Sequence, residues 1–105
     1  MWLQIRVIVE TEIEQGKGNL VRLEAFTISV SAYGGLLEMG HRVQEGQKLL
    51  LTNPAVGARQ DCRVVRVRSS RNGSFAVAFA FDCPTQQFWS IAFSSADRVL
   101  VKNEN

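Results

Sequence analysis

The amino-acid sequence predicts a mainly β fold, a small antiparallel barrel or sandwich, and three observations support this class. Glycines and the pairs Asn53-Pro54 and Asn72-Gly73 interrupt the chain at short, regular intervals. The segments between these interruptions are short and rich in Val, Ile, Leu and Phe, as β-strands are. No segment before Pro84 shows a sustained helical period.

Length and composition narrow the classes of protein further. The chain has 105 residues and is expected to form one domain over residues 1–101, with a frayed end at 102–105. Hydrophobic residues make up 46% and the net charge is +2, which argues against disorder and against polyanion binding driven by bulk charge. No apolar run approaches the roughly 20 residues that span a bilayer, and no signal peptide is evident. A cytoplasmic protein without membrane insertion is expected.

Six apolar stretches are expected to form strands. They are Leu3–Ile13, Asn19–Val30, Leu36–Met39, Lys48–Thr52, Asp61–Ser69 and Phe75–Asp82. The second stretch sets four large apolar side chains in phase on one face, namely Leu20, Phe26, Ile28 and Val30. After Pro84 the pattern predicts one or two short helical pieces whose aromatic side chains, Phe88, Trp89 and Phe93, close the fold. If Trp89 is exposed instead, it is the best candidate for an anchor that contacts a partner.

The last two strands are expected to form a hairpin around Asn72-Gly73, because both residues tolerate the positive φ of a two-residue turn. Strict pairing from this turn puts Arg66 and Arg68 on the same face as the phenylalanines. A bulge between Val64 and Val67 turns the valines inward and the arginines outward. We therefore expect the bulge.

The cysteines and the single histidine bear on catalysis and on metal binding. Strict pairing from the turn sets Cys62 opposite Cys83, whereas the bulge separates them, so two free thiols are expected in a cytoplasmic protein. Cys62, Cys83 and His41 have none of the short spacings of a zinc site, and no metal is expected. One histidine without a Gly-x-Ser-x-Gly motif does not support nucleophilic catalysis. The carboxylates of Glu10, Glu12 and Glu14 are interpreted as a solvated strand face, and no enzyme is expected.

Arginines are concentrated on one predicted strand and its flanks. They are Arg59, Arg63, Arg66, Arg68 and Arg71. Arginine makes bidentate contacts with phosphate, so Arg63, Arg66 and Arg68 are candidates for contact with a phosphate or a partner, and a small barrel can present such a strip to RNA or single-stranded DNA. The alternative is an ordinary half-exposed strand, which the small net charge and the lack of neighbouring stacking aromatics favour.

A second candidate site lies at the turn formed by residues 29–35, with the sequence Ser-Val-Ser-Ala-Tyr-Gly-Gly. Such a turn can direct backbone N–H and hydroxyl groups at a phosphate or a base edge, and glycine permits close approach. Serine and glycine between strands are also common in turns that bind nothing. Ser29, Ser31 and Gly34 are the candidate ligand-binding residues.

The order of several motifs resembles the PilZ domain family over nearly the whole chain up to Phe93. Ser29-x-Ser31-x-x-Gly34 is similar to the family signature Asp/Asn-x-Ser-x-x-Gly. Further similar segments are Gly46-Gln47-Lys48-Leu49, Leu51-Thr52-Asn53-Pro54, Arg63-Val64-Val65-Arg66-Val67, Val77-Ala78-Phe79-Ala80-Phe81 and Phe88-Trp89-Ser90-Ile91-Ala92-Phe93. The resemblance implies a six-stranded antiparallel barrel with a short C-terminal helical segment, in bacterial signalling by cyclic di-GMP.

In family members that bind cyclic di-GMP, an Arg-x-x-x-Arg segment ahead of the first strand clamps the phosphates. This chain keeps Ser31 and Gly34, but Ser29 replaces the planar acid or amide and no arginine pair precedes the first strand. The resemblance therefore implies a non-enzymatic regulatory module that acts by protein–protein contact, with weak or no nucleotide binding and no cofactor. The alternatives are a functional cyclic di-GMP receptor and a small barrel that binds RNA or single-stranded DNA.

Overall fold

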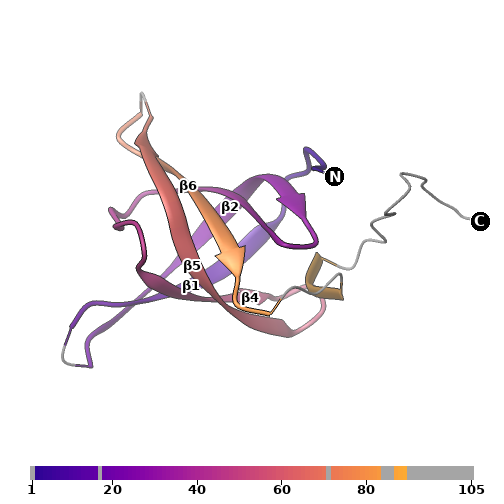
Figure 1. Ribbon diagram of the computed structural model, residues 1–105, viewed down its shortest axis with the longest axis horizontal. Helices are drawn as coiled ribbons and strands as arrows, with labels where there is room; N and C mark the ends of the chain where they lie inside the picture. The colour runs from indigo at the N-terminus through magenta and orange to yellow at the C-terminus, as the bar shows by residue number, and fades with distance from the viewer. Residues whose placement is uncertain (1, 17, 71, 84–86, 90–105) are drawn as a thin grey trace, which may run out of the picture.

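The computed structural model describes residues 2–16, 18–70, 72–83 and 87–89, and these form a closed antiparallel barrel (Figure 1). The strands are β1 (Ile8–Glu14), β2 (Leu20–Ser31), β3 (Gly34–Met39), β4 (Lys48–Asn53), β5 (Ala58–Ser69) and β6 (Phe75–Phe81). They close in the order β1-β2-β3-β6-β5-β4. This confirms the predicted mainly β, six-stranded barrel. Within the described part of the chain, no helix has the length and apolar character to cross a membrane.

A short 3-10 helix, η1 (Gln87–Trp89), follows the strands and closes one end of the barrel. Phe88 is 1% exposed and Trp89 is 3% exposed, and their rings lie 4.7 Å apart at a nearly perpendicular angle of 85°. The amide of Asn53 donates to the carbonyl of Phe88 over 2.8 Å, which holds η1 to the end of β4. The aromatic closure is confirmed for Phe88 and Trp89, and Trp89 is not an exposed anchor. Pro84, Phe93 and the end at 102–105 lie outside the described residues, as does Arg71.

The predicted phase of β2 is wrong. Ala25 and Thr27 are buried, whereas three of the four large side chains predicted to share one face with Val30 point outward, with Leu20 55% exposed, Ile28 40% exposed and Phe26 half-buried. A bulge between Thr27 and Ser29 then returns Val30 to the core. The prediction followed the largest apolar side chains, but this part of the interior takes a methyl group and a hydroxyl instead.

The hydroxyl of Thr27 also explains why β1 begins at Ile8 and not at Leu3. It accepts a hydrogen bond from the N–H of Val7 over 2.7 Å and donates to the carbonyl of Ile5 over 2.6 Å. The Thr27 side chain thereby occupies the N–H of Val7 and the carbonyl of Ile5, which in a continuous strand would pair with backbone groups of the neighbouring strand. The preceding segment is fixed to β2 by a bridge between Leu3 and Val30.

The β5–β6 hairpin contains the predicted bulge but not the predicted two-residue turn. The bulge lies between Val64 and Arg66, with Val64 buried and Arg66 exposed. The N–H of Ser70 donates to the carbonyl of Ser74 over 2.9 Å, so three residues form the loop. Gly73 has a φ of +77°, as three-residue hairpin loops require of the residue before the second strand.

Both thiols are free, as predicted. Cys62 pairs with Phe81 across the hairpin, so it does not face Cys83. Burial, and to a smaller extent the charges of Asp82 and Asp61, raise the pKa of the Cys62 thiol to about 12. Cys62 is therefore a neutral member of the core, whereas Cys83 is exposed.

Candidate binding face

The barrel brings both groups of predicted site residues to one face. Paired residues on neighbouring strands point to the same side of a sheet, so the register defines three cross-strand rows over β2, β3, β6 and β5. These rows are Ser31, Gly34, Ala80 and Arg63; Ser29, Leu36, Ala78 and Arg66; and Phe26, Glu38, Ala76 and Arg68. We call this surface the outer face. Along β6 it carries only alanines, Ala76, Ala78 and Ala80, which we call the alanine strip.

The bulge in β5 is the reason that three arginines share this face. In a regular strand Arg63 would point to the opposite side from Arg66 and Arg68, because side chains alternate. The extra residue at the bulge resets the alternation, and the three arginines pair with Ala80, Ala78 and Ala76. They form an arginine ladder (Arg63, Arg66 and Arg68) whose steps are two residues of β6, about 6.7 Å each.

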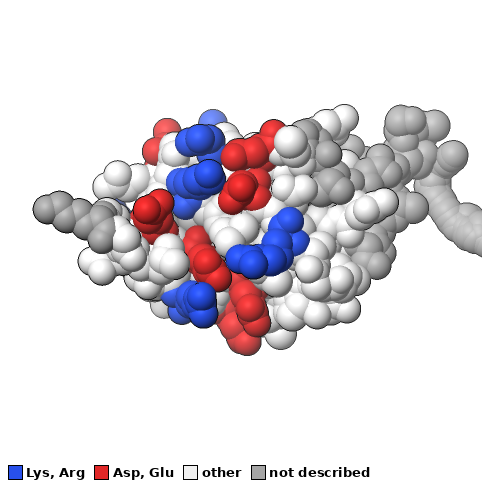
Figure 2. Space-filling model, turned by 90° about the horizontal axis from the view of Figure 1, so that it is seen from below, with Lys and Arg blue, Asp and Glu red and all other residues white. Residues whose placement is uncertain are grey.

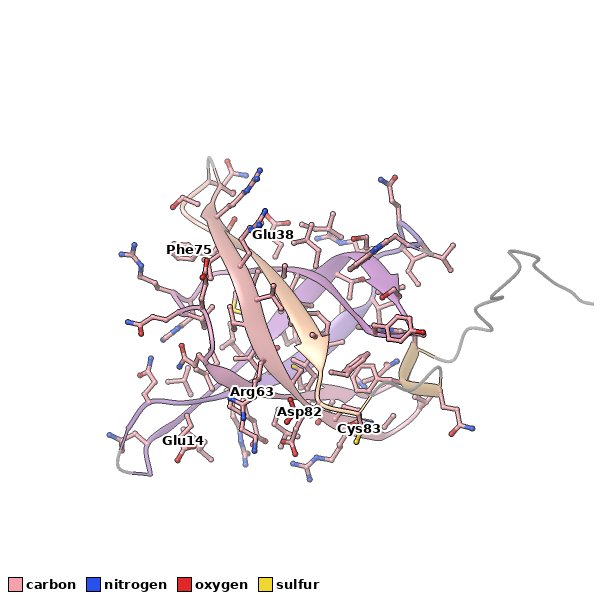
Figure 3. The ribbon with its side chains drawn as sticks, viewed as in Figure 1. Glu14, Glu38, Arg63, Phe75, Asp82 and Cys83 are labelled. Atoms are coloured by element: carbon pink, nitrogen blue, oxygen red, sulfur yellow. The ribbon has the colours of Figure 1, made fainter. Side chains whose placement is uncertain are left out.

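The charges around the arginine ladder are unevenly distributed. The Nε of Arg63 lies 3.8 Å from an Oδ of Asp82, and both side chains are well exposed to solvent (Figure 3). Neither Arg66 nor Arg68 makes an ion pair with another residue that the structure describes. On the far side of the strip, Glu38 accepts a hydrogen bond from the hydroxyl of Ser74 over 3.1 Å. The ladder therefore presents two unpaired cations and one that is weakly paired.

The turn between β2 and β3 uses its polar groups internally. The hydroxyl of Ser31 accepts the N–H of Tyr33 over 3.1 Å, and the carbonyl of Ser31 accepts the indole N–H of Trp89 over 2.9 Å. Gly34 packs so closely on β6 that a Cβ would collide with the carbonyl oxygen of Phe79. Both Ser31 and Gly34 thus have structural reasons to be present, while Ser29 is half-buried in the second row.

The turn and the arginine ladder face the same side but do not meet. Gly34 and Arg63 belong to one row with Ala80 between them, so two strand spacings, about 10 Å, separate their backbones. Ser31 lies one strand further away. The turn and the arginines are therefore two separate groups of residues on one face.

Several exposed apolar residues at this face were missed in the sequence. Tyr33 is 67% exposed at the turn, Val65 is 54% exposed at the bulge, and Ile28 is 40% exposed at the bulge in β2. The bulge in β2 was not predicted, so the exposure of Ile28 could not be read from alternation. The alanine strip had a visible signal, because alanine occupies every second position from Ala76 to Ala80.

The acidic strand, the surface charges and His41 supply further polar contacts among the described residues. Glu12 pairs with Arg22 across β1 and β2 over 3.3 Å, which fits the prediction of a solvated acidic strand face. Basic and acidic side chains are interleaved on the surface shown in Figure 2. Within the described ranges, no three His, Cys, Asp or Glu side chains are grouped to hold a metal ion. The ring of His41 contacts the Gln15 amide and the Arg42 carbonyl at 3.1 Å and 2.8 Å.

The fold and this face define the class of protein as a small closed antiparallel β-barrel with one mixed apolar and basic outer surface. No model of a known protein family matches the chain, and no match was found among the curated proteins.

Proposed function

We propose that the protein is a non-enzymatic, cytoplasmic regulatory module of bacterial cyclic di-GMP signalling, similar to PilZ domains, that acts by protein–protein contact with weak or no nucleotide binding. The observation that carries this proposal is the internal use of the β2–β3 turn. The hydroxyl and the carbonyl of Ser31 both accept hydrogen bonds from the chain itself. The turn therefore has few groups left to offer a nucleotide.

The distance between the turn and the basic residues supports weak nucleotide binding. Each charge-assisted hydrogen bond to a phosphate contributes about 1.5–3 kcal/mol, so a turn without two arginines beside it is weaker by several decades in affinity. Arg63 lies two strand spacings from Gly34 and is paired with Asp82, so it does not replace such a clamp.

Contact with a protein is supported by what the outer face exposes. Tyr33, Ile28 and Val65 present apolar side chains to solvent, and the alanine strip lies between the turn and the ladder. Exposed aromatic and arginine side chains are the residue types that contribute most at protein interfaces.

Calorimetric titration with cyclic di-GMP at moderate salt, with GTP as the control nucleotide, tests the proposal. We expect no saturable heat at high micromolar ligand. Specific binding at micromolar concentration or tighter would contradict the proposal and support a cyclic di-GMP receptor instead.

The arginine ladder favours one second candidate, a barrel that binds RNA or single-stranded DNA. Its evenly spaced guanidinium groups suit a phosphate backbone. Glu38 in the row of Arg68 and Asp82 beside Arg63 weaken this candidate by repelling the same backbone. Association with oligonucleotides that falls steeply with salt would support it.

A further inference from the structure

The alanine strip is a low track on the outer face. Because the barrel is closed, the backbone of β6 is paired with β3 on one side and with β5 on the other. A segment bound along β6 therefore cannot add as a strand there and must be recognised through side chains. Methyl groups form the floor of the track, and the much longer side chains of the arginine ladder border its β5 side.

The spacing of the ladder matches one conformation of a bound chain. Its steps are two strand residues, about 6.7 Å, and alternate side chains of an extended peptide recur at the same distance. In an α-helix, residues on one face recur after three or four positions, about 4.5–6 Å along the axis, and fall out of step over three contacts. An extended segment that runs along β6 keeps one carboxylate beside each arginine.

Charge on the two borders sets the orientation and the length of the occupant. Glu38 lies across the strip from Arg68, so the β3 side repels an acidic side chain. Asp82 lies beside Arg63 at one end of the ladder (Figure 3). The ladder therefore favours carboxylates on the β5 side, over its three positions.

From this arrangement we infer that the outer face binds an extended acidic segment of a partner protein, with carboxylates at every second residue that contact Arg63, Arg66 and Arg68. The inference rests on the proposed role in protein contact and names the chemistry of the partner. Nucleic acid fits less well, because the net charge of the chain is only +2 and polyanion binding depends on a larger excess of cations.

The test measures fluorescence anisotropy of a labelled ten-residue peptide in which glutamate alternates with threonine, at low salt. The variants Arg66→Gln and Arg68→Gln remove one cation each, and we expect each to weaken binding by about two- to fivefold, the range of a single exposed ion pair. Arg59→Gln is the matched control. Arg59 is exposed on the same strand but pairs with Thr52 of β4, outside the β5–β6 pairing, so its removal is expected to leave the affinity unchanged.

Two further probes distinguish recognition of the spacing between carboxylates from attraction by their total charge. A peptide of the same composition with its glutamates contiguous is expected to bind several-fold more weakly, and a thymidine oligonucleotide of equal charge is expected to bind no more tightly than that peptide. Equal binding of both peptides, or an equal loss in Arg59→Gln, would overturn the inference.

Absence of any binding by the alternating peptide would also overturn it, as would tighter binding of the oligonucleotide. None of these peptide results decides nucleotide binding, which the cyclic di-GMP titration measures separately. The two proposals can therefore fail independently of each other.

Discussion

The β2–β3 turn and the arginine ladder lie on the same outer face, but the fold uses their polar groups differently. At the turn, the hydroxyl and the carbonyl of Ser31 are bonded within the protein and Gly34 is held against β6. On the ladder, Arg66 and Arg68 make no ion pair with any other described residue. The comparison teaches that serine and glycine at a turn can serve the fold, while a neighbouring strand keeps its charges available.

The largest expected effect is at Gly34, where the comparison predicts loss of stability and not only loss of binding. In Gly34→Ala the new Cβ meets the carbonyl oxygen of Phe79 and the Cα of Ala80, which are backbone atoms that cannot move aside cheaply. We expect a loss of at least about 2 kcal/mol in unfolding free energy, measured by denaturant titration.

The matched control for this glycine is Gly40→Ala. A Cβ at Gly40 meets nothing within 4 Å, so the unfolding free energy is expected to change by less than about 0.5 kcal/mol. Equal stability of the Gly34 and Gly40 variants would show that the turn is not structurally constrained, and the comparison between turn and ladder would fail.

The next effect concerns the indole that fixes the turn to η1. Trp89→Phe leaves the carbonyl of Ser31 without its donor in a buried position, and we expect a loss of about 1–3 kcal/mol. Trp2→Phe changes an exposed tryptophan, 58% accessible, and is expected to leave the thermal unfolding midpoint unchanged. Matching losses in both variants would contradict a specific role of the Trp89 hydrogen bond.

The free energy of unfolding is expected to depend on pH through Cys62, which lies on the inner side of β5, next to Arg63 of the ladder. The folded-state pKa of Cys62 is raised from 9.0 to about 12, chiefly by burial, so the unfolded chain loses its proton first as pH rises. The contribution of the Cys62 thiol to the free energy of unfolding is therefore fully present below pH 9. It is lost between pH 9 and 12, by at most about 1.4 kcal/mol per pH unit.

Stability measured against pH in Cys62→Ala is expected to lack this part of the slope, whatever the baseline loss. Cys83→Ser is the control, because Cys83 is exposed and its variant should keep the wild-type slope. A slope that disappears in the Cys83 variant instead would reverse the assignment of the two thiols.

The smallest expected effect is on the ladder itself. Arg66 is exposed and is not paired with another described residue, so Arg66→Gln should change the unfolding free energy by no more than about 0.5 kcal/mol. Thermal unfolding measures this directly. A large loss of unfolding free energy would show that Arg66 makes stabilising contacts within the protein, and would contradict the difference proposed between the turn and the ladder.

Much of this fold was predictable from local signals. The six strands, the β5 bulge and the free thiols follow from patterns within single strands or one hairpin. Those patterns left a barrel and a sandwich open, and the resemblance to PilZ domains is what implied the six-stranded barrel. Alternation reports which residues share a face, and the conflict between arginine and phenylalanine positions is sufficient to place a bulge.

The β2 phase and the hairpin loop were not predictable in this way. Ala25 and Thr27 face the interior because the Thr27 hydroxyl forms hydrogen bonds with the backbone of Val7 and Ile5, which lie twenty and more positions away in the chain. The three-residue loop depends on the pairing of Ser70 with Ser74, which a preference for Asn-Gly turns does not reveal.

The sequence by itself thus determined the class of fold and the residue types available for binding, because strand period and turn chemistry are local. Only the tertiary structure decided which of those residues meet. Barrel closure sets the cross-strand register, and the register places the arginine ladder beside the alanine strip and Ser31 under Trp89. Those distances depend on strands far apart in the chain, and no pattern within one strand contains them.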